Sequence, residues 1–450
     1  MPESSCHSPL LTDLYELTMA AAYFENNINA TASFELFVRT LPLERTYLLL
    51  AGLEQALDFL ETLEFQPPQI EFLRRHPVFR HVSDRFFDCL RNLRFAGEVW
   101  AIPEGTPVFA QEPLLRVTAP IIEAQIVETF LLTTLTFQTL IATKAARVVQ
   151  AARGRGVVEF GSRRAHGPEA GVLAARAAYI GGCIGTSNVE AGFRFGIPTY
   201  GTVAHSFVMA YDSEEESFRQ FQRIFPEHAV LLVDTYNTLA AVDKIIQSGL
   251  RPRGVRLDSG DLVELSKAVR RRLNSSGLND TKIFASGDLD ELMISEILAR
   301  GAPVDMFGVG TALATSRDAP ALGGVYKLVE TKFNQQPHYR AKFSEEKFTY
   351  PGPKQVFRFC DPQGAYDRDL IGRADEHKED AETLLTCVMR NGRRMLASPP
   401  LEQIRDRAQH ALGRLPGRYR ELCNAASYPI SFSAALEELM KEVQKSMLQT

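Results

Sequence analysis

Short apolar runs alternate with helical patterns from residue 155 to about residue 310, and this rhythm constrains the fold more than any other feature. Each run ends in small or charged residues, at "GVVEF", "IPTYG", "AVLLV", "GVRL", "KIFA" and "VDMF". A wider gap around "IGGCIGTSN" leaves room for one further unit. Repeated strand–loop–helix units build a parallel sheet or barrel. Because the units share no side-chain signature, they are not the repeats of a solenoid.

The first third of the chain predicts a mixed α+β region. Residues 31–50 and 95–120 have the alternation and the turn residues of short antiparallel strands. One long helix should follow, from Glu123 to about Arg153. Near the start of the chain, apolar residues three and four apart form a helical stripe, at Leu10, Leu14, Leu17, Ala21 and Phe24.

The chain after Lys327 is more polar and irregular. Residues 342–358 read as strands and a turn, and residues 433–448 read as a final amphipathic helix. We expect this tail to pack back on the N-terminal region. The predicted fold class is therefore α/β, with an N-terminal α+β domain over residues 1–135, a TIM-like α/β barrel over 136–330 and a C-terminal region over 331–450.

Composition excludes several classes of protein. The chain has 450 residues with 45% apolar side chains, enough for two or three domains. Its 50 basic and 55 acidic side chains are intermixed and give a net charge of −5, so no overall field favours a nucleic-acid polymer or an anionic membrane. Six scattered cysteines without a C-x-x-C pair argue against disulfides and structural zinc, and favour a reducing cytoplasm. We also expect no signal peptide and no membrane helix.

The loops that follow the strands of a parallel barrel line one face of it, and this gathers the polar residues of the repeated units around one site. Asp234, Asn237 and Asp288 taken alone are explained equally well as helix caps. Ten polar residues on one rim favour a site instead. The predicted rim consists of Arg163, Arg164, His166, His205, Asp234, Asn237, Arg256, Asp258, Asp261 and Asp288.

Two glycine-rich stretches, "ASGD" at 285–288 and "GVGT" at 308–311, follow consecutive late strands. Backbone N–H groups that open onto a helix N-terminus bind phosphate, and a phosphate site recurs at the last two loops of (β/α)8 barrels. Each stretch alone is also typical of an ordinary tight turn. As a pair, they predict a sugar-phosphate site formed by Ser286, Gly287, Gly308, Gly310 and Thr311.

Charged side chains in two earlier loops suit the recognition of anions. In "VRLDSGD", Arg256 and Asp258 lie on one face of a strand end and Asp261 lies in the next turn. The arginine can clamp an acid group, while the two carboxylates face a developing positive charge or Mg²⁺. The alternative is a purely structural ion pair. "FGSRRAHG" adds two consecutive arginines, Arg163 and Arg164, and we expect at most one of them to point to the centre of the site. The alternative is that both are surface residues. We assign Arg163 to the substrate site.

His205 lies in "GTVAHSF", between a small-residue turn and the start of a helix. A lone histidine is most often a structural side chain. This one has Thr202 and Ser206 beside it, on a rim that we expect to bind phosphates. Near neutral pH, histidine acts as a proton donor and acceptor or as a nucleophile toward phosphorus. We therefore predict a functional role for His205.

Eight motifs occur in the order and spacing of one known family: "LLTDLYELTMA", "EAQIVETFLL", "FQTLIATKAARV", "FGSRRAHG", "GTVAHSF", "VRLDSGDL", "FGVGTAL" and "GGVYKLV". The chain resembles nicotinate phosphoribosyltransferase, strongly over residues 9–360 and more loosely in the tail. The resemblance implies a type II phosphoribosyltransferase with an incomplete α/β barrel, and a homodimer whose active sites lie at the interface. One departure is "LLTTLTFQ", where we expect an asparagine near Thr134.

The resemblance also implies a reaction and its participants. Members of the family join nicotinate to 5-phosphoribosyl-1-diphosphate while hydrolysing ATP, and they release nicotinate mononucleotide and diphosphate in NAD salvage. His205 matches the histidine that ATP phosphorylates. Tyr15, Thr202 and Arg256 match the residues that hold nicotinate, and Thr311 matches a contact to the phosphoribosyl donor.

The residues agree with this chemistry. Loss of diphosphate leaves an oxocarbenium-like ribose, which Asp258 and Asp261 would stabilise directly or through Mg²⁺, while arginine and Mg²⁺ stabilise the leaving group.

Three alternatives stay open. A related enzyme would use nicotinamide, a barrel lyase acting on a sugar phosphate would need a Schiff-base lysine that the inferred strand ends lack, and a non-catalytic scaffold would not need His205 or Arg256.

Overall fold

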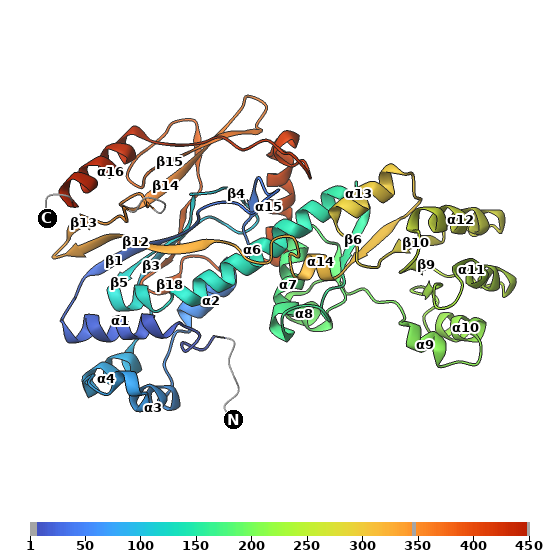
Figure 1. Cartoon of the computed structure of the whole chain (residues 1–450), viewed down its shortest axis with the longest axis horizontal. Coiled ribbons are helices and arrows are strands. Elements are labelled where there is room, and N and C mark those ends of the chain that lie inside the picture. The colour runs from blue at the N-terminus through green and yellow to red at the C-terminus, as the bar shows by residue number, and fades with distance from the viewer. Residues whose placement is uncertain (1–6, 344–347, 448–450) are drawn as a thin grey trace. The chain divides into compact units, whose positions relative to one another are not determined.

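The computed structural model describes residues 7–343 and 348–447. The chain forms two compact units, one made of the residues up to Thr139 together with those from Ala321 onward, and the other made of Leu140–Pro320. The chain therefore leaves the first unit, forms the second, and returns to the first (Figure 1). The division into three regions at residues 135 and 330 stays a prediction.

Leu140–Pro320, which is described in full, contains the parallel sheet that the sequence rhythm predicts. The strand order is β7-β6-β11-β10-β9-β8, and all neighbours are parallel. Because β11 pairs with β6, the last strand lies beside the first, while β7 and β8 remain as edges and leave the barrel incomplete. The strands are β6 (Gly156–Glu159), β7 (Gly185–Thr186), β8 (Val230–Leu232), β9 (Gly254–Leu257), β10 (Lys282–Ala285) and β11 (Met306–Val309).

Five of the six predicted apolar runs form or adjoin these strands, and β7 occupies the wider gap, as expected. The strand predicted at "IPTYG" is wrong, because this segment forms only a single bridge, between Thr186 and Thr199. Pro198 has no N–H group to extend the pairing. The intervening helices are α7 (Pro168–Ile180), α8 (Val189–Phe195), α9 (His205–Met209), α10 (Glu214–Ile224), α11 (Thr238–Gln247), α12 (Leu262–Ser275), α13 (Glu291–Ala299) and α14 (Thr311–Ala314).

The first unit is built on antiparallel strands, and its largest sheet has the order β13-β12-β1-β5-β3-β17-β18. Because β17 pairs with β3, the tail packs on the N-terminal region, which confirms the expectation. Two smaller sheets have the orders β16-β14-β15-β19 and β2-β4. The strands are β1 (Thr31–Val38), β2 (Leu48–Leu49), β3 (Glu98–Ala101), β4 (Pro107–Val108), β5 (Pro113–Pro120), β12 (Gly324–Phe333), β13 (Gln336–Tyr339), β14 (Lys354–Cys360), β15 (Tyr366–Arg373), β16 (Ala381–Thr383), β17 (Thr386–Arg390), β18 (Arg393–Arg394) and β19 (Ile430–Phe432).

The long helix predicted from Glu123 to Arg153 is two helices, α5 (Ile121–Gln125) and α6 (Glu128–Ala151). The break has a physical cause, because the Thr129 N–H donates to the buried Glu16 carboxylate (3.1 Å). The stretch 121–151 is long and apolar enough to cross a membrane, but 61% of its most apolar window is buried, as is typical of a core helix. The other helices here are α1 (Leu14–Glu25), α2 (Leu53–Glu61), α3 (Pro67–Arg75), α4 (Asp84–Asn92), α15 (Leu401–Arg414) and α16 (Ala434–Met447).

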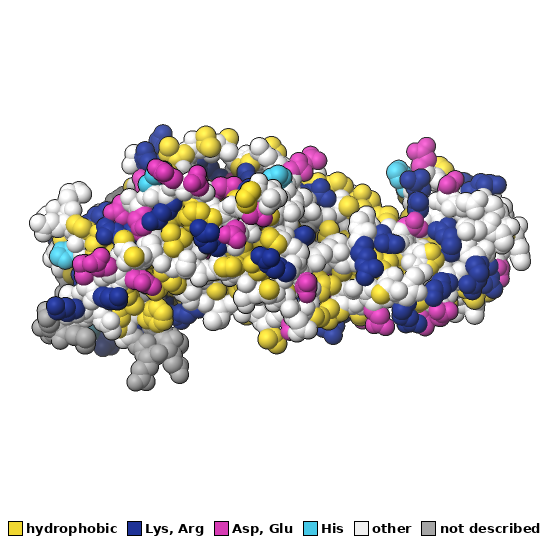
Figure 2. All heavy atoms as spheres, turned by 90° about the horizontal axis from the view of Figure 1, so that it is seen from above, with side chains coloured by type: hydrophobic (Ala, Val, Ile, Leu, Met, Phe, Trp, Pro, Cys, Tyr) yellow, Lys and Arg dark blue, Asp and Glu magenta, His cyan; other side chains and the backbone are white. Residues whose placement is uncertain are grey.

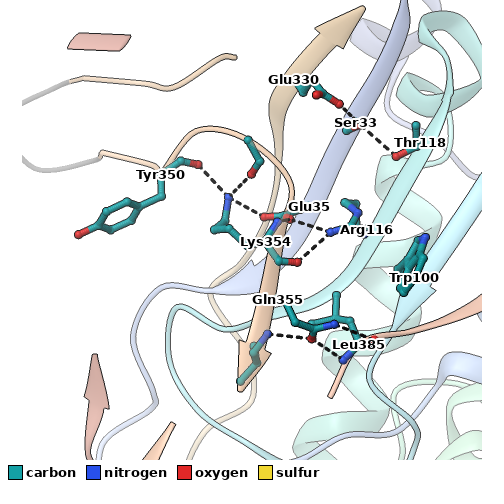
Figure 3. Close-up of polar contacts among 12 residues, drawn as sticks. Ser33, Glu35, Trp100, Arg116, Thr118, Glu330, Tyr350, Lys354, Gln355 and Leu385 are labelled. Carbon is teal, nitrogen blue, oxygen red and sulfur yellow. Dashed lines mark hydrogen bonds and ion pairs between the residues drawn. The ribbon is translucent and has the colours of Figure 1, made fainter. Parts of the chain in front are cut away.

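A buried cluster of charged side chains ties the tail to the large sheet (Figure 3). The carboxylate of Glu35 on β1 lies 2.7 Å from the Lys354 Nζ and also accepts the Lys354 backbone N–H (2.7 Å). Arg116 on β5 donates to the Lys354 carbonyl oxygen (2.8 Å). Burial lowers the pKa of Lys354, although Glu35 opposes this shift. The cluster therefore fixes the start of β14 against β1 and β5.

Candidate active site

A hollow of about 370 Å³ lies within Leu140–Pro320, at the carboxyl ends of the parallel strands. Parallel strands bring their carboxyl ends to one edge, so residues far apart in the sequence meet there. Five of the residues predicted for the site line this hollow. The full lining is Phe160, Ser162, Arg163, Ser187, Gly201, Thr202, Val203, Ala204, His205, Leu232, Arg256 and Asp258.

Arg256, near the end of β9, is the centre of the polar contacts in the hollow. Its Nε donates to the Ser286 hydroxyl (2.8 Å) and its Nη1 to the Thr202 hydroxyl (3.0 Å). Its Nη2 lies 2.6 Å from an Asp258 carboxylate oxygen. The guanidinium carbon lies 5.6 Å from the centre of the Phe160 ring, within the range of cation–π attraction. The guanidinium group is therefore fixed in orientation on all these sides.

Asp258 is an ionised carboxylate in the same network. Burial alone would raise its pKa, but the hydrogen bond from Ser286 and the charge of Arg256 outweigh burial, so the pKa is lowered. The Asp258 backbone N–H donates to Asp234 (3.1 Å), whose same oxygen also accepts the Ser259 hydroxyl (2.6 Å). The other Asp234 oxygen is buried and has no hydrogen-bond partner among the described residues. The hollow therefore has one partly exposed carboxylate, Asp258, whose backbone is held by a second aspartate.

His205 begins helix α9 and is partly buried at the wall of the hollow. Its Nδ1 lies 3.1 Å from the hydroxyl of Thr235, which follows β8. Its Nε2 has no hydrogen-bond partner in the described part of the chain. An imidazole held through one nitrogen presents the other to a ligand, so His205 is positioned for proton or phosphoryl transfer.

The glycine turns lie where the backbone leaves no room for a side chain. Gly287 has φ +100°, and a Cβ there would lie 2.1 Å from the Asp258 carbonyl oxygen. A Cβ on Gly308 would lie 2.7 Å from the Phe160 ring. Since Asp258 and Phe160 both line the hollow, these turns adjoin it on the same rim as His205.

Other predicted residues lie outside the lining. Gly310 is the residue before α14, and Thr311 begins that helix. The Asp261 side chain caps α12, because one oxygen accepts two backbone N–H groups of the first turn (3.0 and 3.1 Å). Asn237 caps α11 in the same way (2.9 Å), and Asp288 has a left-handed backbone with φ 48°. A catalytic role for Asp261 stays a prediction.

The two consecutive arginines diverge. All three of Arg163, Arg164 and His166 are exposed, but only Arg163 belongs to the lining of the hollow. Tyr15 lies on α1 in the other unit, and its side chain is 46% exposed. Burial and the charge of Glu128 raise the Tyr15 pKa, so its hydroxyl stays neutral at physiological pH.

Sequence reasoning did not select seven of the twelve lining residues, among them Phe160, and it also missed Thr235, the partner of His205. Phe160 ends an apolar run, and the pattern alone predicts only a strand residue at this position. Its position directly after the last strand residue, next to Gly161, was the available signal. Thr235 follows Asp234 in a loop whose charged and amide side chains, Asp234 and Asn237, are the ones that the pattern indicates.

Three family models match the chain. The N-terminal domain of nicotinate phosphoribosyltransferase matches residues 10–136, and its C-terminal domain matches residues 377–440. The C-terminal domain of quinolinate phosphoribosyl transferase matches residues 141–319, the segment that holds the parallel sheet. The matches therefore cover both compact units.

Whole-chain comparisons agree. A nicotinate phosphoribosyltransferase of Mycobacterium tuberculosis is 48% identical over 434 residues (94% of this chain, 91% of the relative), and one of Bacillus subtilis is 38% identical over 457 residues (94% and 92%). Human nicotinic acid phosphoribosyltransferase superposes with a TM-score of 0.83 at 28% identity (96% and 99% covered). Nicotinate-nucleotide pyrophosphorylase of Pyrococcus furiosus superposes at 0.74 with 26% identity (92% and 97%). The chain belongs to the nicotinate phosphoribosyltransferase family.

Proposed function

We propose that this enzyme joins nicotinate to 5-phosphoribosyl-1-diphosphate and releases nicotinate mononucleotide and diphosphate, a step of NAD salvage. The observation that carries the proposal is the fixed guanidinium of Arg256, which lies against Phe160 and Asp258 in one hollow. The hollow thus offers a cation for a carboxylate, an aromatic face for a pyridine ring and a carboxylate for positive charge. The names of the relatives support the same activity.

Arg256 is the residue that recognises the nicotinate carboxylate. A guanidinium group has five N–H donors, and three nitrogens of Arg256 each have one protein partner, so donors remain for a ligand. Thr202 and Ser286 hold the group in place. Its positive charge favours nicotinate over the neutral amide, nicotinamide. The Phe160 ring supplies the surface on which the pyridine ring stacks.

The bond exchange at the ribose needs no general base. The lone pair of the pyridine nitrogen forms the new bond to C1, and the electron pair of the breaking C1–O bond leaves with diphosphate. Asp258, kept ionised by its neighbours, stabilises the positive charge at C1. The backbone N–H groups around Gly287, Gly308 and Gly310, together with Thr311, hold the phosphates. Arg163 stabilises the leaving diphosphate.

His205 couples ATP hydrolysis to this reaction. With Nδ1–H donated to the Thr235 hydroxyl, the lone pair of Nε2 attacks the γ-phosphorus of ATP, and ADP leaves. Water later hydrolyses the phosphohistidine and returns the free imidazole. The phosphoryl group adds negative charge beside the diphosphate, and this charge favours closure or product release.

Mg²⁺ fits this site as an ion that arrives with the phosphates. In the described part of the chain, no three His, Cys, Asp or Glu side chains gather closely enough to hold a metal alone. Mg²⁺ usually takes one or two carboxylates plus phosphate oxygens and water. Asp258, and Asp234 with its unpartnered buried oxygen, are the carboxylates that would hold it. When bound, the ion neutralises charge on the leaving diphosphate.

The assembly that we propose is a cytoplasmic homodimer with shared active sites. Tyr15 is half-exposed on a different unit from Arg256, and a second copy of the chain can bring its Tyr15 to the open face of the pyridine ring. The cysteines of the described residues are all free, which supports a reducing compartment.

A coupled assay for nicotinate mononucleotide, with and without ATP, tests the proposal on the native enzyme and on His205→Ala. The variant should keep ATP-independent synthesis and lose ATPase activity, and equal stimulation by ATP in both proteins would remove His205 from the mechanism. Kinetics with both pyridines test Arg256, since a preference for nicotinamide would overturn its role. No turnover with all substrates present would favour a scaffold.

A further inference from the structure

A second hollow, of about 660 Å³, lies at the opposite edge of the parallel sheet, where the strands begin. It includes the first residues of β6 and β10 and the residue before β11, whereas the candidate active site surrounds the other ends of the strands. The two hollows share no residue. The second is lined by Arg153, Gly154, Arg155, Gly156, Arg270, Asn274, Asn279, Lys282, Pro303, Val304 and Asp305.

Four cations face a single carboxylate in this hollow. One oxygen of Asp305 accepts Arg270 (3.1 Å) and a backbone N–H (2.8 Å), and its other oxygen lies 3.6 Å from the Lys282 Nζ. Neither Arg153 nor Arg155 forms an ion pair with a carboxylate of the described residues. The hollow therefore carries an excess of positive charge in a protein whose net charge is −5.

Backbone contacts hold two of the cations in place. The Arg155 Nε donates to the Val304 carbonyl oxygen (2.8 Å), and the Arg270 Nη2 donates to the Thr281 carbonyl oxygen (2.9 Å). Each guanidinium keeps further N–H donors for a ligand. Lys282 has half of its side chain exposed and can follow the ligand. A preorganised arginine pair loses less entropy on binding than free side chains do.

The surroundings of the hollow carry side chains of both charges. A neighbouring hollow of about 650 Å³ has two arginines, Arg251 and Arg253, and two carboxylates, Glu227 and Asp280, in its lining. Both hollows use the chain segment from Gly277 to Lys282. Figure 2 shows Lys and Arg side chains gathered at the right of the molecule, over the unit that carries α12. The excess of positive charge is therefore concentrated in the hollow itself, where four cations face one carboxylate.

We propose that the hollow around Arg153, Arg155, Arg270 and Lys282 binds a short polyphosphate chain, free or on a nucleotide, at a site separate from catalysis. Guanidinium groups match phosphate oxygens in two-pronged hydrogen bonds. The volume lies within the usual range for small-molecule sites. Since the lining has no aromatic side chain, it offers the phosphates partners but gives a base no stacking surface.

Occupancy of this site should stabilise the barrel. The ligand would bridge the beginnings of β6, β10 and β11, which are neighbours in the sheet. A ligand that binds only the folded protein raises the melting temperature. Ser286 and Gly287 follow β10, and Gly308 lies near the end of β11, so the site is placed to steady the catalytic loops as well.

Isothermal titration with inorganic tripolyphosphate tests the proposal on the full chain. We expect two classes of site, of which nicotinate mononucleotide displaces the ligand from one. In the double variant Arg153→Gln/Lys282→Gln, the affinity of the class of site that resists displacement should fall by about tenfold or more, because two charged hydrogen bonds to tripolyphosphate are lost. Arg271→Gln, an exposed arginine of α12 outside the lining, is the matched control and should bind like wild type.

The other ligands identify what is recognised. If ATP binds at this class of site about as tightly as tripolyphosphate, and orthophosphate binds far more weakly, the site recognises the phosphate chain. The proposal would be overturned if this class of site bound ATP but not tripolyphosphate, or if wild type showed a single class of site. An equal loss of affinity in the Arg271→Gln control would overturn it as well. Tighter binding of duplex DNA that the double variant abolishes would assign the surface to nucleic acid instead. The binding measurements do not depend on the proposed activity, because none of them requires turnover.

Discussion

Replacing Thr235 with valine tests whether the imidazole of His205 is held ready for a phosphoryl group. The substitution removes the hydroxyl that lies 3.1 Å from Nδ1 and keeps the size and branching of the side chain. A neutral hydrogen bond contributes about 0.5–1.5 kcal/mol, so phosphohistidine should form about 2- to 12-fold more slowly. Quenched-flow transfer of the labelled γ-phosphoryl group from ATP measures this rate as acid-labile label on the protein.

Thr235→Ser is the matched control, because serine keeps the hydroxyl. We expect this variant to be phosphorylated at nearly the wild-type rate. Both variants should keep ATP-independent synthesis, since Thr235 does not line the hollow. A valine variant as fast as wild type, or a serine variant as slow as valine, would refute the argument that this hydrogen bond sets the orientation of the ring.

Three further predictions test the network around the site and the barrel that supports it. Arg256→Gln should raise the KM for nicotinate by about tenfold or more and change that for nicotinamide little, in steady-state kinetics with both pyridines. Gly287→Ala places a Cβ 2.1 Å from a backbone carbonyl oxygen at φ +100°, so it should cost about 1–3 kcal/mol and lower the melting temperature in calorimetry. Glu291→Gln removes the buried carboxylate that lies 2.5 Å from Lys144 and 3.0 Å from Arg147. Urea unfolding at pH 7 should show that the free energy of unfolding falls by about 3 kcal/mol. This is the low end for a broken buried pair, because Lys144 keeps a second carboxylate, Asp318. Burial opposes ionisation of Glu291, but the charge of Lys144 outweighs burial and lowers the pKa of Glu291. The contribution of this ion pair to stability is therefore present above the unfolded pKa of about 4.3 and is lost as pH falls through the lower folded pKa. The urea midpoints of wild type and variant should therefore converge in acid.

The local pattern of the sequence predicted most of the barrel because strand length, turn residues and helical periodicity are properties of neighbouring residues. It failed where distant residues decide the outcome. The predicted long helix divides because the carboxylate of Glu16, more than a hundred residues earlier in the chain, accepts the Thr129 N–H. The strand at "IPTYG" is a different case, because its cause is local: Pro198 has no N–H group to donate, and the sequence shows this directly.

The same contrast holds for the site. Arg256, Asp258, Thr202 and His205 were predicted because their residue types suit the chemistry and the ends of parallel strands converge. Phe160 could not be predicted as a ring that faces Arg256, since that depends on the direction of two side chains, one directly after β6 and one on β9. The cap formed by Asp261 was open to prediction, because an aspartate directly before a helix is a common cap.

The return of the chain to its first unit affects how the protein is made. Strand β1 lies between β5 and β12, and Thr31 pairs with Lys332. On the ribosome β5 is available once Pro120 has emerged, but the other side of β1 stays open until the entire barrel has been translated. An open strand edge recruits other chains, and pairing across such a distance is slow. A substitution that only delays folding of the barrel should therefore lower the yield of native protein, by prolonging the exposure of an edge that it never touches.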